Sequence, residues 1–168
     1  MSRLRFDLMR LDLTSHRELE SALRSLKESD VPELLEMAAD EDPKLQAVAS
    51  WLLYRGIEAG LPFGNPDWAT WMSHLDGLTQ WAAKLHFCQA YHLADIPLAE
   101  AARATLTRWF ETDRPFVRAW AMSALVHDAT LRGGDEDQIE SLVSRGLGDP
   151  AASVRARARH VSKSLQNR

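Results

Sequence analysis

One short phrase recurs four times along this chain of 168 residues. Its copies read LQAVAS, LTQWAA, VRAWAM and VRARAR, and they begin at Leu45, Leu78, Val117 and Val154. The fifth position of every copy is an alanine, and these alanines are 33, 39 and 37 residues apart: Ala49, Ala82, Ala121 and Ala158. A period of this length constrains the fold more than any other feature, because it is typical of arrays of two-helix units.

The residues around each shared alanine have helical spacing. An apolar residue stands four positions before the alanine and another stands three positions after it. On a helix these three residues share one face, and the small alanine lets a neighbouring helix approach closely. Helical spacing also precedes each phrase, at 31–39, 66–75, 97–110 and 137–147, and proline stands at several of the expected helix starts. We therefore expect an all-α protein in which each unit pairs a first helix with a phrase helix.

Two copies extend into a longer motif. DRPFVRAWAMSAL (113–125) and DPAASVRARARHV (149–161) both combine an aspartate and a proline with Val-Arg and spaced alanines. This motif resembles the second helix of HEAT-like (armadillo-type) repeats. The first and second copies are weaker matches, with Gln46 and Thr79 at the arginine position.

The resemblance implies a specific architecture. The expected fold is a right-handed α-solenoid of about four HEAT-like two-helix repeats with an N-terminal capping helix. Residues 1–29 would form the N-terminal segment and capping helix, and residues 30–168 the repeat array. The repeats would cover approximately 30–60, 65–93, 95–131 and 135–168.

The resemblance also assigns a structural role to the phrase arginines. In HEAT-like proteins this arginine commonly pairs with an aspartate in the turn, so that a ladder links the repeats. The ladder residues expected here are Arg118 and Arg155 with Asp113 and Asp149. A structural role is also the usual one for a partly buried arginine.

A second row of residues lies on the side of each phrase helix away from its first helix. The row is apolar in the first three copies and basic in the last, and it predicts the partner-binding residues: Tyr54, Phe87, Met122, Val126, Arg159 and Lys163. In HEAT-like arrays the second helices usually line the concave side, and an uncharged row there indicates a bound partner. An alternative stays open, in which residues 4–13 cover the row.

Composition narrows the function classes. The net charge of −4 disfavours a protein that wraps nucleic acid. No apolar stretch approaches the ~20 residues needed to cross a bilayer, so no membrane partner is expected. Cys88 is the single cysteine, which indicates a reducing cytoplasm. His86, Cys88 and His92 cannot all converge on one ion, so neither a metal nor another cofactor is expected.

No familiar catalytic motif stands in the sequence. The predicted function is a non-enzymatic scaffold that binds a protein or peptide on its concave face, and self-association is left open. The alternative is an AlkD-like alkylpurine DNA glycosylase or another DNA-binding HEAT-like protein. The glycosylase family is built from HEAT-like repeats, and FVRAW (116–120) is similar to one of its phrases. Asp76, five residues after Trp71, is the nearest candidate for its catalytic aspartate, but the spacing departs from the family pattern. The predicted groove also has few basic residues for phosphate contacts.

Overall fold

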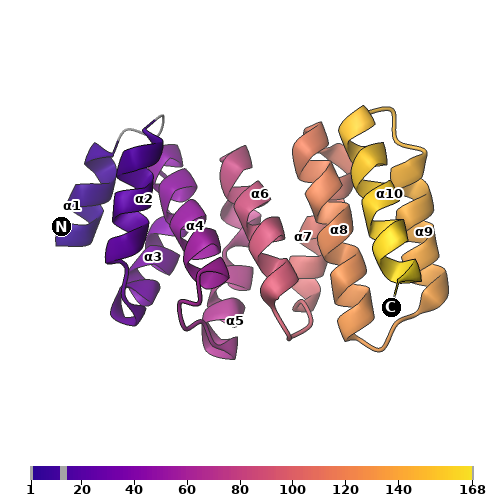
Figure 1. The fold of residues 1–168 in the computed structure, drawn as a ribbon, viewed down its shortest axis with the longest axis horizontal. Helices are drawn as coiled ribbons and strands as arrows, with labels where there is room; N and C mark the ends of the chain where they lie inside the picture. The colour runs from indigo at the N-terminus through magenta and orange to yellow at the C-terminus, as the bar shows by residue number, and fades with distance from the viewer. Residues whose placement is uncertain (1, 12–14, 168) are drawn as a thin grey trace. The chain divides into compact units, whose positions relative to one another are not determined.

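The structure is a computed structural model that describes residues 2–11 and 15–167. These residues form ten α-helices and three short 3-10 helices, with no strand among them, and the all-α prediction is confirmed. Figure 1 shows the α-helices in chain order: α1 (Arg3–Arg10), α2 (His16–Ser25), α3 (Val31–Ala38), α4 (Pro43–Glu58), α5 (Asn65–Ser73), α6 (Trp81–Ala90), α7 (Glu100–Thr112), α8 (Pro115–Leu131), α9 (Glu136–Leu147) and α10 (Ala152–Gln166). The 3-10 helices are η1 (Glu28–Asp30), η2 (Leu75–Gly77) and η3 (Tyr91–Leu93).

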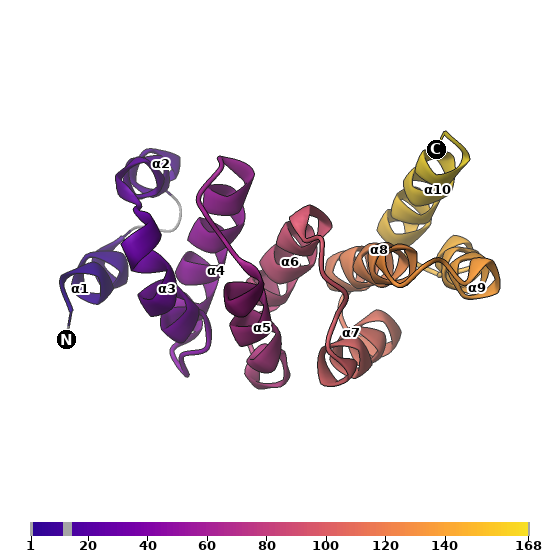
Figure 2. The same ribbon diagram turned by 90° about the horizontal axis from the view of Figure 1, so that it is seen from below.

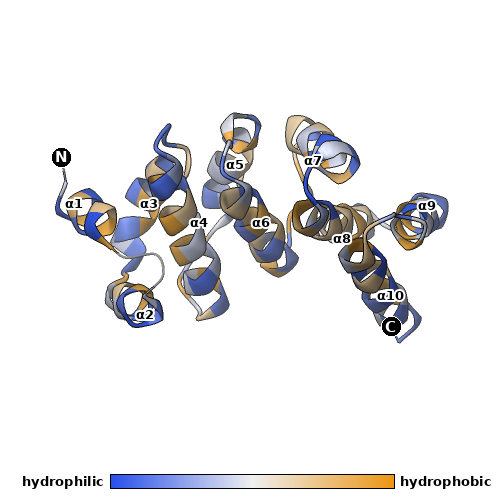
Figure 3. Cartoon of the chain, turned by 90° about the horizontal axis from the view of Figure 1, so that it is seen from above, coloured by the Kyte–Doolittle hydropathy of each residue, from blue (hydrophilic) through white to orange (hydrophobic). Residues whose placement is uncertain are grey.

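The chain divides into two compact units, Met1–Leu93 and Ala94–Arg168. In the first unit α3 packs on α4 and α5, and α4 packs on α6 as well as on α1 and α2. In the second unit α8 contacts α7, α9 and α10, and α9 also packs on α10 (Figure 2). Because α8 has three neighbours, apolar residues are spread around most of its circumference (Figure 3).

The N-terminal segment holds two α-helices where we expected one. The expected capping helix at 15–27 corresponds to α2, whose first turn is capped by Ser15. The additional helix α1 buries Leu8 and is tied to the start of α4, since Arg5 pairs with Asp40 and Lys44 donates to the carbonyl of Met9. The described part of segment 4–13 therefore contacts α4 near its N-terminus, and residues 12 and 13 lie outside the described residues.

The four phrases lie at different positions relative to the starts of their helices. In α4, α8 and α10 the whole phrase is helical, whereas α6 begins only at Trp81. The backbone N–H groups of Thr79 and Gln80 donate to the side chain of Gln46, and Gln80 in turn caps Ala82. The expectation that the second phrase is helical from Leu78 is therefore corrected. The turn before α6 is held by side chains of its own unit.

The shared alanines mark places where helices approach closely. Ala49, Ala121 and Ala158 are completely buried, and Ala82 is half-buried. At Gly146 on α9, an added Cβ would lie 2.9 Å from the Cβ of Ala158 and 3.4 Å from Cε of Met122. Real Cβ atoms do not pack at the shorter distance, so α9 needs glycine where it meets α10.

Candidate functional site

The apolar row expected to line an open groove lies inside the protein. Phe87 and Met122 are fully buried and Val126 is 3% exposed. The Phe87 ring meets the Trp71 ring edge-on at 5.2 Å and stacks on Tyr91 at 5.9 Å. The expectation that these three side chains are open to a partner is therefore corrected.

Neighbouring helices contact the phrase helices at the row and beside it. In the first unit the Tyr54 ring on α4 stacks on the His86 ring of α6, and the Ser50 hydroxyl of α4 lies 3.0 Å from Nδ1 of His86. In the second unit Met122 of α8 lies against Gly146 of α9. In these contacts the row forms the seam between one phrase helix and the helices that follow it.

The last copy of the phrase exposes the equivalent positions. Arg159 and Lys163 occupy on α10 the positions of Met122 and Val126 on α8, and both are exposed. Helix α10 carries four arginine or lysine residues and no aspartate or glutamate between Ala152 and Gln166. Its hydrophilic outer side contrasts with α8 in Figure 3. Of the six predicted partner-binding residues, these two cations lie fully on the surface and Tyr54 is half-buried.

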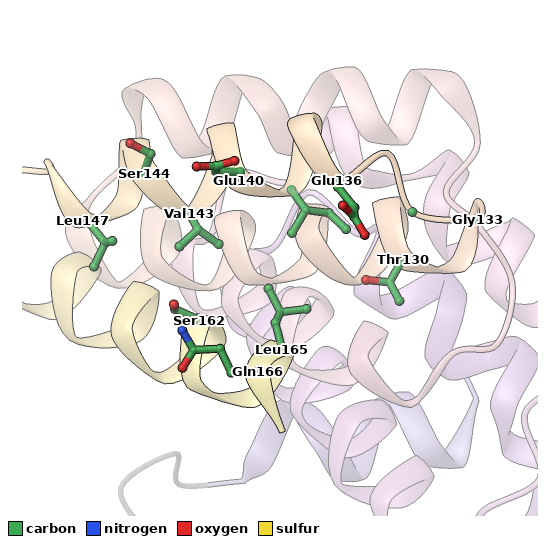
Figure 4. A pocket seen from close by; sticks show the side chains of 12 residues that line it. Thr130, Gly133, Glu136, Glu140, Val143, Ser144, Leu147, Ser162, Leu165 and Gln166 are labelled. Carbon is green, nitrogen blue, oxygen red and sulfur yellow. The ribbon is translucent and has the colours of Figure 1, made fainter. Parts of the chain in front are cut away.

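A cleft of about 1090 Å³ lies between α9 and α10, beside the C-terminal end of α8. Val143 and Leu147 point from α9 toward α10, and Leu165 points back toward α9 (Figure 4). Leu147 is 42% exposed and is the exposed large apolar side chain in this lining. The remaining lining residues are Thr130, Gly133, Gly134, Glu136, Ile139, Glu140, Ser144, Ser162 and Gln166.

The sides of this cleft differ in charge. Glu136 and Glu140 are exposed on α9. At about 100° per residue, four residues fall within about 60° of one another on α10: Arg155, Arg159, Ser162 and Gln166. Two of them line the cleft, so the arginines continue the same side of the helix. Sequence reasoning missed this site, although apolar residues at i, i+4 and i+8 in α9 (Ile139, Val143 and Leu147) were a usable signal.

The phrase arginines bind turns. Arg118 donates Nε to Asp149 Oδ2 at 3.2 Å and Nη2 to Asp149 Oδ1 at 2.7 Å, while its Nη1 donates to the carbonyl of Asp113 at 3.1 Å. Burial raises the pKa of Asp149, but the hydrogen bonds from Arg118 and from the Ala151 N–H outweigh it, and the pKa lies below its ordinary value. Arg155 donates Nη1 to the carbonyls of Asp149 and Pro150 in its own turn.

A buried carboxylate that the sequence analysis did not single out holds the start of the second unit. Asp128 is fully buried and accepts hydrogen bonds from the Leu98 N–H at 2.7 Å, from Arg103 Nε at 2.8 Å and from Arg132 Nε at 3.0 Å. The neighbouring His127 lies 2.9 Å from the carbonyl of Ala94. These contacts explain why α7 begins at Glu100 and not at 97 as expected. Their role is structural.

Chemical groups for metal binding do not gather in the part of the chain that the structure describes, where no cluster of three His, Cys, Asp or Glu side chains has suitable geometry. Burial lowers the pKa of His86 to about 4, and Cys88 is also buried. Trp71 is fully buried and its ring contacts those of Phe63, Trp68 and Phe87, whereas Asp76 is exposed in η2. The pair considered for a glycosylase site is thus split between the core and the surface.

Comparison of the chain with protein-family models, with curated proteins and with solved structures found no match. Within the described residues, every helix is too short or too polar to traverse a lipid bilayer.

Proposed function

We propose that this protein is a non-enzymatic binding module that takes an amphipathic helix of a partner protein in the cleft between α9 and α10. The observation that carries this proposal is the cleft itself, with its apolar lining and its exposed Leu147. Grooves of this kind bind a helix through apolar residues spaced three or four positions apart. Ile139, Val143 and Leu147 offer the matching stripe on α9, one residue per helical turn.

The charged residues beside the cleft would fix how the partner helix is rotated about its own axis. Basic residues on one of its flanks would meet Glu136 and Glu140 of α9, and acidic residues on the other flank would meet the cations of α10. Charges at the edge of an interface mainly set specificity and association rate, while the buried apolar contacts supply affinity. The proposed site thus lies at the last helix pair and not at the buried row of the sequence prediction. Arg159 and Lys163 are exposed on α10 but are not among the residues that line the cleft.

The fold proposed for this function is a short HEAT-like solenoid. Its support is the four-fold phrase, the pairing of α4 with α6 and of α8 with α10, and the arginine-to-turn contacts. The cleft between α9 and α10 is lined by apolar side chains from both of these helices, which favours binding. A glycosylase has less support, because Trp71 is buried in the core while Asp76 is exposed.

Site-specific cross-linking tests this function. A photoreactive amino acid is placed at Leu147 in the cleft or, as a matched control, at Leu93, a leucine with 50% exposure outside it. Proteins cross-linked in the native host are identified, and the affinity of the purified partner is measured for Leu147→Asp and Leu93→Asp. We expect at least a tenfold loss for Leu147→Asp, about 1.4 kcal/mol, and less than twofold for Leu93→Asp. Equal cross-linking at both positions, or equal losses, would reject the cleft as the binding site.

A further inference from the structure

Arg118 shows how this protein binds a carboxylate with a phrase arginine. One guanidinium nitrogen, Nη1, is anchored to a carbonyl in the turn before its own helix, that of Asp113. The other two, Nε and Nη2, hold both oxygens of Asp149, in the turn before the next phrase helix. The anchor fixes the guanidinium plane, and the two remaining donors, Nε and Nη2, match the two oxygens of a carboxylate. We call this pair of donors the carboxylate fork.

Gln46 in the first unit also hydrogen-bonds to two turns with the two ends of its side-chain amide. Its Nε2 donates to the carbonyl of Asp40 in its own turn at 2.8 Å, and its Oε1 accepts the N–H groups of Thr79 and Gln80 in the next turn. At both positions one half of the side chain binds its own turn and the other half binds the turn that follows. Arg5 makes a related contact, because it pairs at 2.6 Å with Asp40 in the turn before α4.

Arg155 occupies this position on α10 and has only the first half of the arrangement. Its Nη1 donates to the carbonyls of Asp149 and Pro150 at 2.8 and 2.7 Å, as Nη1 of Arg118 does to Asp113. Its side-chain hydrogen bonds to the described residues come from Nη1. The two nitrogens that hold a carboxylate in Arg118 are therefore available in an anchored, half-buried guanidinium.

We propose that Arg155 binds a carboxylate of the partner protein, an aspartate or glutamate placed just before the partner's helix as Asp149 is placed before α10. This inference rests on the proposed function and gives its partner a chemical feature. Arg155 lies on the same side of α10 as the cleft residues Ser162 and Gln166, so one bound segment can reach both. Helix α10 has no acidic residue of its own, and the nearby Asp149, which interacts electrostatically with Arg155, has both of its oxygens hydrogen-bonded by Arg118.

A carboxylate fits better than a phosphate of nucleic acid. The internal example of the fork, at Arg118, holds a carboxylate in bidentate geometry. The whole chain carries a net charge of −4, which repels a polyanion. A partner helix with a few acidic residues on one side is repelled less than a polyanion, because its negative charge lies only beside the cations of α10.

Nuclear magnetic resonance of the arginine Nε–Hε groups tests this binding directly in the 168-residue chain. The Arg155 signal is assigned with Arg155→Lys, which keeps the charge and loses the fork. The probes are an acetylated peptide of residues 146–158, which contains Asp149, and its Asp149→Asn version. We expect the Arg155 signal to shift with a midpoint at least fivefold lower for the aspartate peptide, and the exposed Arg159 to show no such preference. Equal midpoints for the two peptides, or a lower midpoint for a short single-stranded oligonucleotide, overturn the proposal.

The partner identified by cross-linking separates this inference from the proposed function. If both hold, Arg155→Lys weakens binding at least fivefold and Arg159→Lys less than twofold, while Leu147→Asp also weakens it. If Leu147→Asp alone weakens binding, the cleft stands and the carboxylate fork is wrong. If the peptide midpoints differ as expected while Leu147→Asp has no effect, the fork stands and the cleft is wrong.

Discussion

The two units satisfy their buried polar groups by different chemistry. In the first unit the buried polar side chains are the neutral Gln46 and Ser50, beside a largely buried, neutral His86. In the second unit they include the charged Asp128, which is held by two arginines. Both arrangements attach a turn to a phrase helix. The first unit does so through the amide hydrogen bonds of Gln46, and the second through the ion pairs and the hydrogen bond of Asp128.

This difference has energetic consequences. A neutral hydrogen bond contributes about 1 kcal/mol net and responds little to salt or acid. A buried ion pair adds little over an apolar replacement, but the loss of one partner leaves an uncompensated charge and is costly. The second unit is therefore expected to be the more sensitive to substitution of a polar core residue, and the first unit to protonation of the largely buried His86.

The largest expected effect is at Asp128. Asp128→Ala removes the acceptor of three hydrogen bonds and leaves the partly buried Arg103 and the Leu98 N–H without it. We expect a loss of about 3–5 kcal/mol in the free energy of unfolding, measured by urea denaturation. Hydrogen exchange should increase first in the second unit, from Ala94 onward. An exchange increase confined to the first unit would contradict this division of the chain.

A matched substitution sharpens the comparison. Gln46→Ala removes a similarly buried polar side chain with three hydrogen bonds, all of them neutral. Its expected cost is smaller, about 1–3 kcal/mol, because no charge is stranded. If Gln46→Ala and Asp128→Ala cost the same, the charge of Asp128 is not what sets its effect.

Much of the fold could be predicted from sequence because it depends on local spacing. The helical phrases and their buried alanines follow from apolar periodicity, and the helix content confirms the all-α class. The row of Phe87, Met122 and Val126 was assigned to the wrong environment for a physical reason. Periodicity shows which residues share a face of a helix, but not which neighbouring helix covers that face.

The candidate site was less accessible to sequence reasoning. The cleft depends on how α9, α10 and the end of α8 pack, and its lining residues come from all three. Asp128 was missed because its partners Leu98, Arg103 and Arg132 share no motif with it. Arg159 and Lys163, in contrast, are exposed because charge at a seam position can be accommodated only where no helix covers it.

The next largest effect concerns acid and belongs to the first unit. Burial lowers the pKa of His86 to about 4, while an unfolded chain has the ordinary value of about 6.5. The unfolded state therefore binds a proton more readily. The stability contributed by neutral His86 is complete above about pH 7 and is lost as the pH falls from 6.5 toward 4. Between pH 7 and pH 5 we expect a loss of about 2 kcal/mol, measured by urea denaturation at each pH.

His86→Gln should remove this part of the pH dependence, because glutamine does not titrate. The exposed His160 provides the control, and His160→Gln should leave the pH profile of the wild-type protein unchanged. A profile that is the same in His86→Gln and the wild type would show that His86 is not the responsible group.

The smallest effect is expected at the ladder of the second unit. Arg118→Gln gives this position the side chain that the first unit uses at Gln46. One amide can keep the bond to the Asp113 carbonyl but cannot bind both oxygens of Asp149. Asp149 still accepts the Ala151 N–H, and its side chain is 11% exposed, so water can replace part of the loss. We expect a cost of about 1–2 kcal/mol in urea denaturation at pH 7.

The acid response of this variant tests whether the ladder works through charge. In the wild type, Arg118 helps to hold the pKa of Asp149 below its ordinary value, so this contribution is present above about pH 4 and is lost as the pH falls through the lowered pKa. The stability difference between Arg118→Gln and the wild type should therefore shrink in acid and in high salt. Arg159→Gln, at an exposed arginine, should stay within about 0.5 kcal/mol of the wild type throughout. A difference for Arg118→Gln that is constant across pH and salt would mean that packing of the arginine stem, and not its ion pair, fastens α8 to the next turn.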